Sequence, residues 1–194
     1  MTIPRYWPGA VLVVAVIAAT PGCAPVVVVG GAAAVSAAHD RRTLGAQVDD
    51  QTIELKSVSA INDDKQLADE THINVTSING IVLLTGEAST TELRDRILST
   101  VRSISGVRRI VNQIRIAPPT TLASRSNDAW LTTKVKTSLL ATEKLDASRI
   151  KVVTEDSTVY LMGLVTRSEG NLATDASRSV GGVQRVVKLF EYLD

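Results

Sequence analysis

Cysteine, histidine and aromatic residues are scarce in this chain, and each shortage removes a class of function. The 194 residues include one cysteine, Cys23, and two histidines, His39 and His72. One cysteine cannot form an internal disulfide, and without clustered partners it cannot hold a zinc ion. Neither histidine has the neighbours of a catalytic triad, and no glycine-rich loop has a nucleotide-binding spacing. The sequence therefore predicts no catalytic residue, no metal site and no cofactor.

An excess of one charge is also missing. The chain has 21 Lys and Arg residues against 20 Asp and Glu residues. Without an overall positive field, nucleic acid is not expected as a partner. Aromatic residues make up 3% and hydrophobic residues 44%. The cores must therefore be built from aliphatic side chains, which leave little volume for a deep ligand cavity.

Acidic pairs occur in the chain, but their spacing does not suit a metal. Asp49-Asp50, Asp63-Asp64 and Glu155-Asp156 lack the alternate-residue pattern of a calcium-binding loop. We interpret them as helix caps and turns.

What the chain does have is an internal repeat. The segment INVTSINGIVLLTGEASTTE at 73–92 aligns with IKVVTEDSTVYLMGLVTRSE at 150–169. Aligned positions carry similar residues, as in Val82 with Val159, so the chain contains two copies of one structural unit.

The repeat and the composition together predict five segments. Residues 117–126, which include two prolines and several Ser and Thr residues, are predicted to be a linker. The expected segments are a signal peptide at 1–22, an apolar tether at 23–47, domain 1 at 48–116, the linker, and domain 2 at 127–194.

Each copy has the pattern αββαβ. In domain 1, Asn79-Gly80 between two apolar runs is a strong signal for a tight hairpin turn, and Ser89 with Glu92 has the spacing of a helix capping box. The predicted domain 1 elements are a helix at 49–62, strands at 72–77 and 81–87, a helix after Ser89, and a strand at 107–116. Those of domain 2 are a helix at 128–141, strands at 150–154 and 158–165, a helix at 168–180, and a strand at 183–192. Ser157 replaces the turn glycine in domain 2, so a different hairpin turn is expected there.

This order of elements fixes the fold class as α+β. A hairpin pairs its strands antiparallel, whereas a strand-helix-strand crossover is right-handed and makes a parallel pair. Each domain is therefore expected to be a three-stranded mixed sheet with two helices packed on one face, and with the other face open for contacts.

The N-terminus has the organisation of a secretory signal. An uncharged apolar run from Gly9 to Thr20 follows a short segment with Arg5 and precedes Cys23. It resembles a bacterial lipoprotein signal, in which the cysteine is acylated, for example with palmitate, and becomes the first mature residue. Two alternatives remain: an ordinary signal peptide with an incidental cysteine, or an uncleaved anchor.

The duplicated motif resembles the BON domain, a module of bacterial envelope proteins, with a V-x-V…G-x-V-x-L-x-G core, a helix and then Gly-Val-x-x-Val. In domain 1 it is carried by Val75, Gly80, Val82, Leu84, Gly86, Gly106, Val107 and Ile110. In domain 2 it is carried by Val152, Val159, Leu161, Gly163, Gly182, Val183 and Val186. The resemblance to dual-BON lipoproteins implies attachment to the periplasmic face of the outer membrane, binding of anionic phospholipid through domain 2, and support of envelope integrity.

The first helix of domain 2 offers a surface for such a lipid. At 100° per residue, Leu131, Val135 and Leu139 form one stripe that should face the sheet, and Trp130 lies about 140° from its centre. An outward Trp and Leu flanked by lysines are typical of a membrane interface. The residues predicted to bind phospholipid are Trp130, Thr133, Lys134, Lys136, Thr137 and Leu140.

Two alternatives apply to this surface. Trp130 could instead pack on domain 1 or on the linker. Separately, the chain could be a protein-interaction adaptor for an outer-membrane assembly or cell-wall remodelling factor, docked through an open sheet face or an edge strand. The sequence makes no prediction of the oligomeric state.

Overall fold

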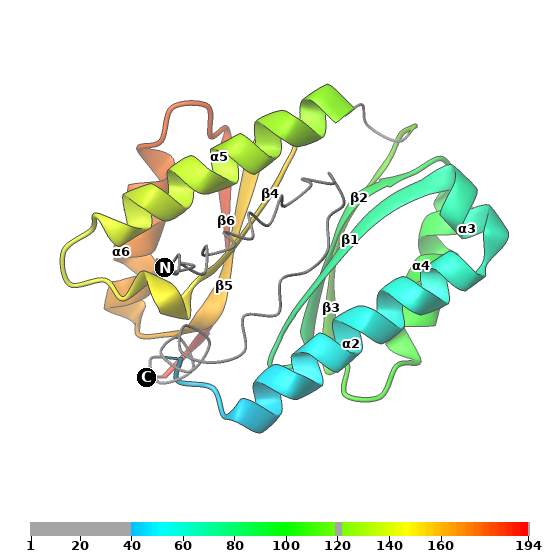
Figure 1. Cartoon of the computed structure of the whole chain (residues 1–194), viewed down its shortest axis with the longest axis horizontal. Helices are drawn as coiled ribbons and strands as arrows, with labels where there is room; N and C mark the ends of the chain where they lie inside the picture. Colours follow the sequence, from blue (N-terminus) through cyan, green and yellow to red (C-terminus); the bar gives the residue numbers. More distant parts are fainter. Residues whose placement is uncertain (1–39, 119–121, 194) are drawn as a thin grey trace, which may run out of the picture.

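The structure, a computed structural model, describes residues 40–118 and 122–193 (Figure 1). Domain 1 contains α2 (Leu44–Asp63), α3 (Lys65–Glu70), β1 (Thr71–Ile78), β2 (Ile81–Ala88), α4 (Thr91–Arg102) and β3 (Arg109–Ile116). Domain 2 contains α5 (Leu122–Leu140), the 3-10 turn η1 (Ala147–Arg149), β4 (Lys151–Glu155), β5 (Thr158–Val165), α6 (Arg167–Arg178) and β6 (Arg185–Tyr192). The αββαβ order is confirmed, with α3 and η1 as additions that the sequence pattern did not predict.

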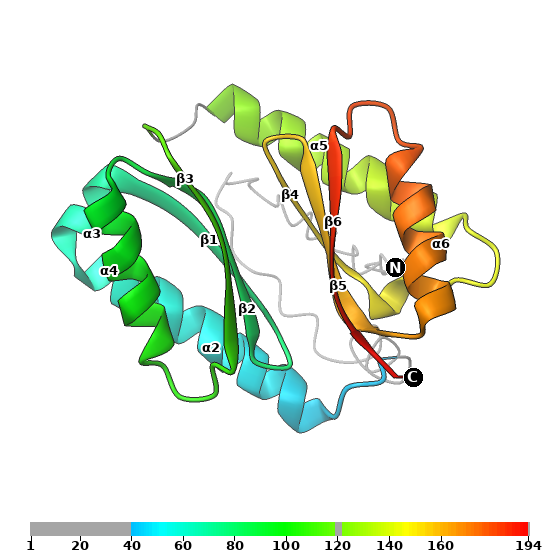
Figure 2. The same ribbon diagram turned by 180° about the vertical axis from the view of Figure 1, so that it is seen from behind.

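Each domain contains one three-stranded mixed sheet, as predicted. The strand orders are β1-β2-β3 and β4-β5-β6, so the second strand is central in both sheets. β1 pairs with β2 antiparallel and β2 with β3 parallel, and the second sheet repeats both pairings. The helices cover the outer face of each sheet (Figures 1 and 2).

Both first helices begin earlier than predicted. α2 starts at Leu44, inside the predicted tether, because the Thr43 side chain caps it by accepting from the Ala46 backbone N–H. α5 starts at Leu122, inside the predicted linker. The prediction that Asp49-Asp50 caps the first helix was therefore wrong.

The second helices begin with side-chain caps. In α6 the predicted capping box is present, since Thr166 accepts from the Glu169 backbone and Glu169 accepts from the Thr166 backbone. In α4 the cap is Thr90, which accepts from the Leu93 backbone, so the predicted position was one residue early.

The two hairpin turns have the same backbone geometry. Asn79 and Gly80 have φ values of 49° and 70°, and Asp156 and Ser157 have φ values of 47° and 56°. Two successive left-handed residues make the turn that best matches the twist of a hairpin. The expectation that Ser157 would impose a different turn was wrong.

A buried aspartate from the first helix holds each turn. The Asp50 carboxylate accepts from the backbone N–H groups of Asn79 and Gly80 at 2.7 and 2.9 Å. The Asp128 carboxylate accepts from the corresponding two turn N–H groups at 2.9 and 3.0 Å. In both domains these bonds satisfy turn N–H groups and fix the helix to the hairpin.

Each domain has its own aliphatic core between sheet and helices. In domain 1 it includes Ile53, Ile61, Leu67, Val82, Leu84, Leu93, Ile97 and Val101. In domain 2 it includes Val135, Leu139, Ile150, Val152, Val159, Leu161, Val165 and Phe190.

The other faces of the two sheets pack on each other (Figures 1 and 2). One hydrophobic cluster combines Ile78, Ile81 and Leu83 of domain 1 with Tyr160 and Met162 of domain 2. As a result β2 is buried at all eight of its positions. The prediction of an open sheet face was therefore wrong, because each sheet covers the other.

Polar pairs surround this contact. The Arg115 guanidinium donates at 2.8 Å to Glu87 of its own domain and at 2.8 Å to Asp156 of domain 2. Glu87 is fully buried, so its charge needs this partner. The Asn74 amide of domain 1 donates to the Glu155 carboxylate of domain 2 at 3.0 Å.

The residues that enter α2 also connect both domains. Arg41 donates to both carboxylate oxygens of Glu169 in domain 2, at 2.7 and 3.1 Å. Arg42 donates to Asp50 in domain 1 at 2.8 Å. Although burial opposes it, hydrogen bonds from the Thr166 backbone and from Arg41 lower the pKa of Glu169 to about 2. The Glu169 carboxylate is thus ionised at neutral pH.

Replacing Asp128 should destabilise domain 2. Asp128→Ala removes two part-buried hydrogen bonds from turn N–H groups to a carboxylate, each worth about 1.5–3 kcal/mol. We expect the urea unfolding midpoint to fall markedly, and to fall less for Asp128→Asn, which keeps one acceptor. The exposed Asp175→Ala on α6 is the control, and an equal effect of the two alanine variants would contradict this role of Asp128.

Ionised Glu155 should weaken the native structure at neutral pH. Burial raises the pKa of the Glu155 carboxyl above its ordinary 4.5, so the folded state holds this proton more tightly than the unfolded state. The contribution of this group to stability is therefore greatest below pH 4.5 and is lost as the pH rises through the raised pKa.

Glu155→Gln, which keeps an oxygen for Asn74, should therefore raise Tm by a few degrees at neutral pH and bring no gain in acid. Calorimetry across pH, with the exposed Glu143→Gln as control, tests this expectation. A gain that did not depend on pH would rule out ionisation as its cause.

Candidate functional site

The candidate site is the outer face of α5. Leu131, Val135 and Leu139 are buried against the second sheet, which confirms the predicted inward stripe. Asp128 ties the helix to the hairpin turn, and the Ser138 hydroxyl donates to the Ala176 carbonyl of α6 at 3.0 Å. The opposite side of α5 is thus held in a fixed orientation toward solvent.

Trp130 and Leu140 are the apolar residues of this outer face. They are 60% and 74% exposed. The alternative that Trp130 packs on domain 1 or on the linker does not hold for the residues that the structure describes.

Lys134 lies beside the tryptophan. Its ammonium nitrogen is 4.3 Å from the centroid of the Trp130 ring and donates to the Gly181 carbonyl at 2.6 Å. The lysine therefore links the ring to the loop between α6 and β6 through a cation–π contact and a hydrogen bond. Lys134 orients the ring. Its ammonium group already uses part of its hydrogen-bonding capacity within the protein.

The hydroxyls of the two threonines on this face are bonded within the helix. Both are exposed, but the Thr133 hydroxyl donates to the Ala129 carbonyl at 3.1 Å and the Thr137 hydroxyl donates to the Thr133 carbonyl at 3.0 Å. With their protons used by the helix backbone, these hydroxyls do not offer donors to a phosphate.

Lys136 and Leu140 border a small cavity that the sequence did not predict. Its volume is about 230 Å³, and its lining residues are Lys136, Leu139, Leu140, Ala147, Ser148 and Ile150. The cavity exists because η1 passes under the end of α5. The sequence signal for η1 is Asp146, which caps this turn by accepting from the Ser148 backbone.

The charge on α5 has one sign on its outer side. The only acidic residue of the helix is Asp128, which is buried and bonded to the hairpin turn. Lys134 and Lys136 are therefore not opposed by a carboxylate of the same helix. Such a face attracts anions and repels cations.

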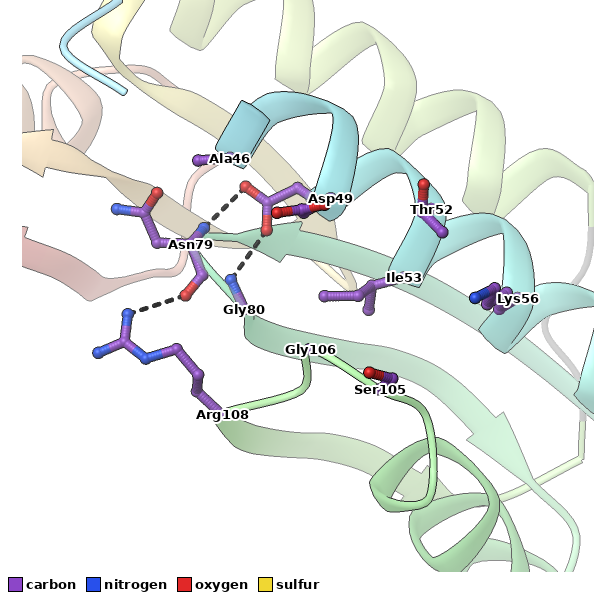
Figure 3. Close-up of a pocket in the computed structure, with 11 residues that line it drawn as sticks. Ala46, Asp49, Thr52, Ile53, Lys56, Asn79, Gly80, Ser105, Gly106 and Arg108 are labelled. Atoms are coloured by element: carbon purple, nitrogen blue, oxygen red, sulfur yellow. Dashed lines mark hydrogen bonds between the residues drawn. The ribbon is translucent and has the colours of Figure 1, made fainter. Parts of the chain in front are cut away.

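Domain 1 has a different surface at the corresponding place. Because Asp50 and Asp128 play the same part, Thr52 corresponds to Trp130 and Lys56 to Lys134. Without the indole, a cavity of about 470 Å³ opens between α2 and the hairpin (Figure 3). Its lining includes Asp49, Lys56, Asn79, Ser105 and Arg108, so both charge signs are present.

The arginine of this cavity supports the hairpin turn. Arg108 donates to the Asn79 carbonyl at 3.0 Å, as the dashed line in Figure 3 marks. It also approaches Glu191 of domain 2 at 3.4 Å. The arrangement that we predict for lipid binding is therefore particular to domain 2.

Several features bear on other functions. No helix within residues 40–118 and 122–193 is long and apolar enough to cross a membrane. The described residues contain no group of three or more His, Cys, Asp or Glu side chains suited to a metal ion. Cys23, the signal peptide and most of the tether lie outside the described residues.

Comparison with known proteins places the chain in a family. Residues 49–118 and 127–194 each match the model of the BON domain. Outer membrane lipoprotein DolP of Haemophilus influenzae is 38% identical over 173 residues, covering 89% of this chain and 90% of the relative. A 21 kDa hemolysin of Actinobacillus pleuropneumoniae is 35% identical over 154 residues, 79% of each chain. Osmotically-inducible protein Y of Escherichia coli is 24% identical over 146 residues, covering 74% of this chain and 72% of the relative.

These matches extend over both domains and over most of each relative. None of the three relatives bears the name of an enzyme. The chain therefore belongs to the BON-domain family, as a two-domain outer-membrane lipoprotein of the DolP type.

Proposed function

We propose that the chain is anchored to the periplasmic face of the outer membrane through an acylated Cys23, and that domain 2 binds anionic phospholipid through the outer face of α5. This binding would support the integrity of the envelope. The observation that carries the proposal is the exposed Trp130, which has a lysine on its ring and shares the outer face of α5 with the exposed Leu140. The one carboxylate of this helix, Asp128, is buried.

Each outer side chain has a place at a bilayer surface. The indole of Trp130 lies at headgroup depth, where its apolar ring and its N–H are both accommodated. Leu140 enters the boundary of the acyl chains beside the small cavity, and Lys136 meets phosphate. Lys134 stays on the ring and adds its positive charge to the local field.

The magnitudes suit a contact that selects lipid rather than one that anchors. A lysine near an anionic surface contributes about 1 kcal/mol, and burial of a large apolar side chain contributes about 1.5–3 kcal/mol. The acyl groups on Cys23 supply the attachment and hold α5 close to the bilayer. Domain 2 then needs only a weak preference for anionic headgroups to decide where in the membrane the protein gathers.

The adaptor alternative required either an open sheet face or an edge strand, and the first of these surfaces is buried. The open sheet faces that it required are buried against each other, so only edge strands remain for an envelope protein partner. A partner of that kind stays a prediction of the sequence.

Charge reversal on α5 should weaken vesicle binding. Lys136→Glu turns an attraction of about 1 kcal/mol into a repulsion of similar size, so affinity for phosphatidylglycerol vesicles should fall roughly tenfold or more. Trp130→Ala should reduce it comparably by removing the interfacial ring. Co-sedimentation at low and high salt measures both effects. Lys188→Glu, an exposed lysine of domain 2 outside α5, is the matched control. Unchanged binding by both α5 variants would end the proposal.

The anchor has its own test. Mass spectrometry of the N-terminal peptide from membrane-purified protein should find Cys23 as the first residue with a diacylglyceryl group attached. Cys23→Ala should release the protein from the outer-membrane fraction. An intact N-terminus starting at Met1 would contradict lipidation and would support an uncleaved anchor.

A further inference from the structure

The exposed large apolar side chains of this molecule are concentrated on the first helix of each domain. α2 and α5 lie nearer the viewer than α4 and α6 in Figure 1, and Figure 2 shows the reverse. Of the eight large hydrophobic side chains that are exposed, four are on α2 and two on α5, and α4 and α6 carry none among the residues described. The α5 pair is Trp130 and Leu140, which belong to the proposed lipid-binding face.

The four residues on α2 form a single stripe, which we call the α2 stripe. It consists of Leu44, Val48, Leu55 and Val58, with exposed fractions between 41% and 73%. Spacings of four, seven and three residues keep these side chains on one face of a helix. That face is about 140° around the helix from the buried side, so no element of its own domain covers it.

Most polar residues beside the stripe are uncharged, and Glu54, one turn before Val58, accepts a hydrogen bond from the Ser77 backbone N–H. Gln51, Thr52, Ser59 and Asn62 lie between or next to the stripe residues. The charged side chains of α2 point toward its flanks or its buried side, as with Asp50, which is buried under the hairpin turn. An uncharged apolar face suits the boundary between headgroups and acyl chains, where no ion must be desolvated.

We propose that the α2 stripe is a second membrane contact, through which domain 1 rests on the same bilayer as α5. This inference depends on the proposed function of α5. It is supported by the shared side of the two helices, and by the position of α2 directly after Asp40, where the described part of the chain begins behind the proposed anchor. Domain 2 then recognises anionic headgroups, while domain 1 adds an apolar contact that does not depend on headgroup charge.

The two contacts together fix the orientation of the protein. With α2 and α5 on the bilayer, α4 and α6 face away from it, and their exposed surfaces are rich in charged residues such as Arg94, Asp95, Arg167 and Asp175.

The test uses the acylated full chain in vesicles of phosphatidylglycerol and phosphatidylcholine with brominated acyl chains. Since Cys23 is consumed by acylation, a cysteine introduced by Leu55→Cys is the only free thiol and takes a fluorescent label. Ser99→Cys on α4 is the matched control, because it is exposed on a helix of the same domain that lies on the other side. Trp130 stays in place and reports separately on α5 by its own fluorescence.

Three outcomes separate the two proposals. If the label at position 55 is quenched several-fold more than the label at position 99, the α2 stripe contacts the bilayer. If Trp130 is quenched while positions 55 and 99 behave alike, the inference about domain 1 is overturned and the function of α5 stands. If Trp130 is not quenched in any sample, the proposed function itself fails.

A second measurement distinguishes another occupant of the stripe. Sedimentation of the chain in detergent, with and without Leu55→Glu, reports whether the stripe joins two copies. A dimer that Leu55→Glu converts to a monomer would overturn the membrane contact in favour of self-association. A monomer in both cases, together with quenching at position 55, is the result we expect.

Discussion

The contact between the two sheets is the constraint on which the rest of the molecule depends. A three-stranded sheet with helices on one side leaves its other face exposed, and here those faces carry Ile81, Leu83, Tyr160 and Met162. Exposing these apolar faces to water is unfavourable, so each sheet is stabilised by covering the other. Neither domain buries this surface by itself, and the two domains therefore form one body.

This arrangement decides what is left for function. With both sheet faces used internally, the helices become the outermost layers, and contact with a membrane must come from them. The second helices, α4 and α6, are polar on their outer sides, whereas the first helices, α2 and α5, carry large apolar residues on both sides. The duplication thus gave two equivalent helices, and substitution at single positions such as Thr52 and Trp130 made them different.

Much of the fold could be predicted because its signals are local. The repeat, the Asn79-Gly80 turn and the capping box at Thr166 each depend on residues close in sequence, and so does the inward stripe of α5. The packing of the sheets could not be predicted in this way. The unbroken apolar run of β2 indicates a strand covered on both faces, but the run does not say what covers it. For the site, exposure of Trp130 followed from helix periodicity, whereas the bond from Lys134 to Gly181 depends on a loop 47 residues away.

The residues just before α2 have a mechanical consequence. Arg41 is bonded to domain 2 and Arg42 to domain 1, so the segment that would lead from the proposed anchor contacts both domains before it enters the first helix. Tension along that chain is shared between two ion pairs at one point of attachment. A force along this segment therefore acts on both domains together and does not separate the two sheets.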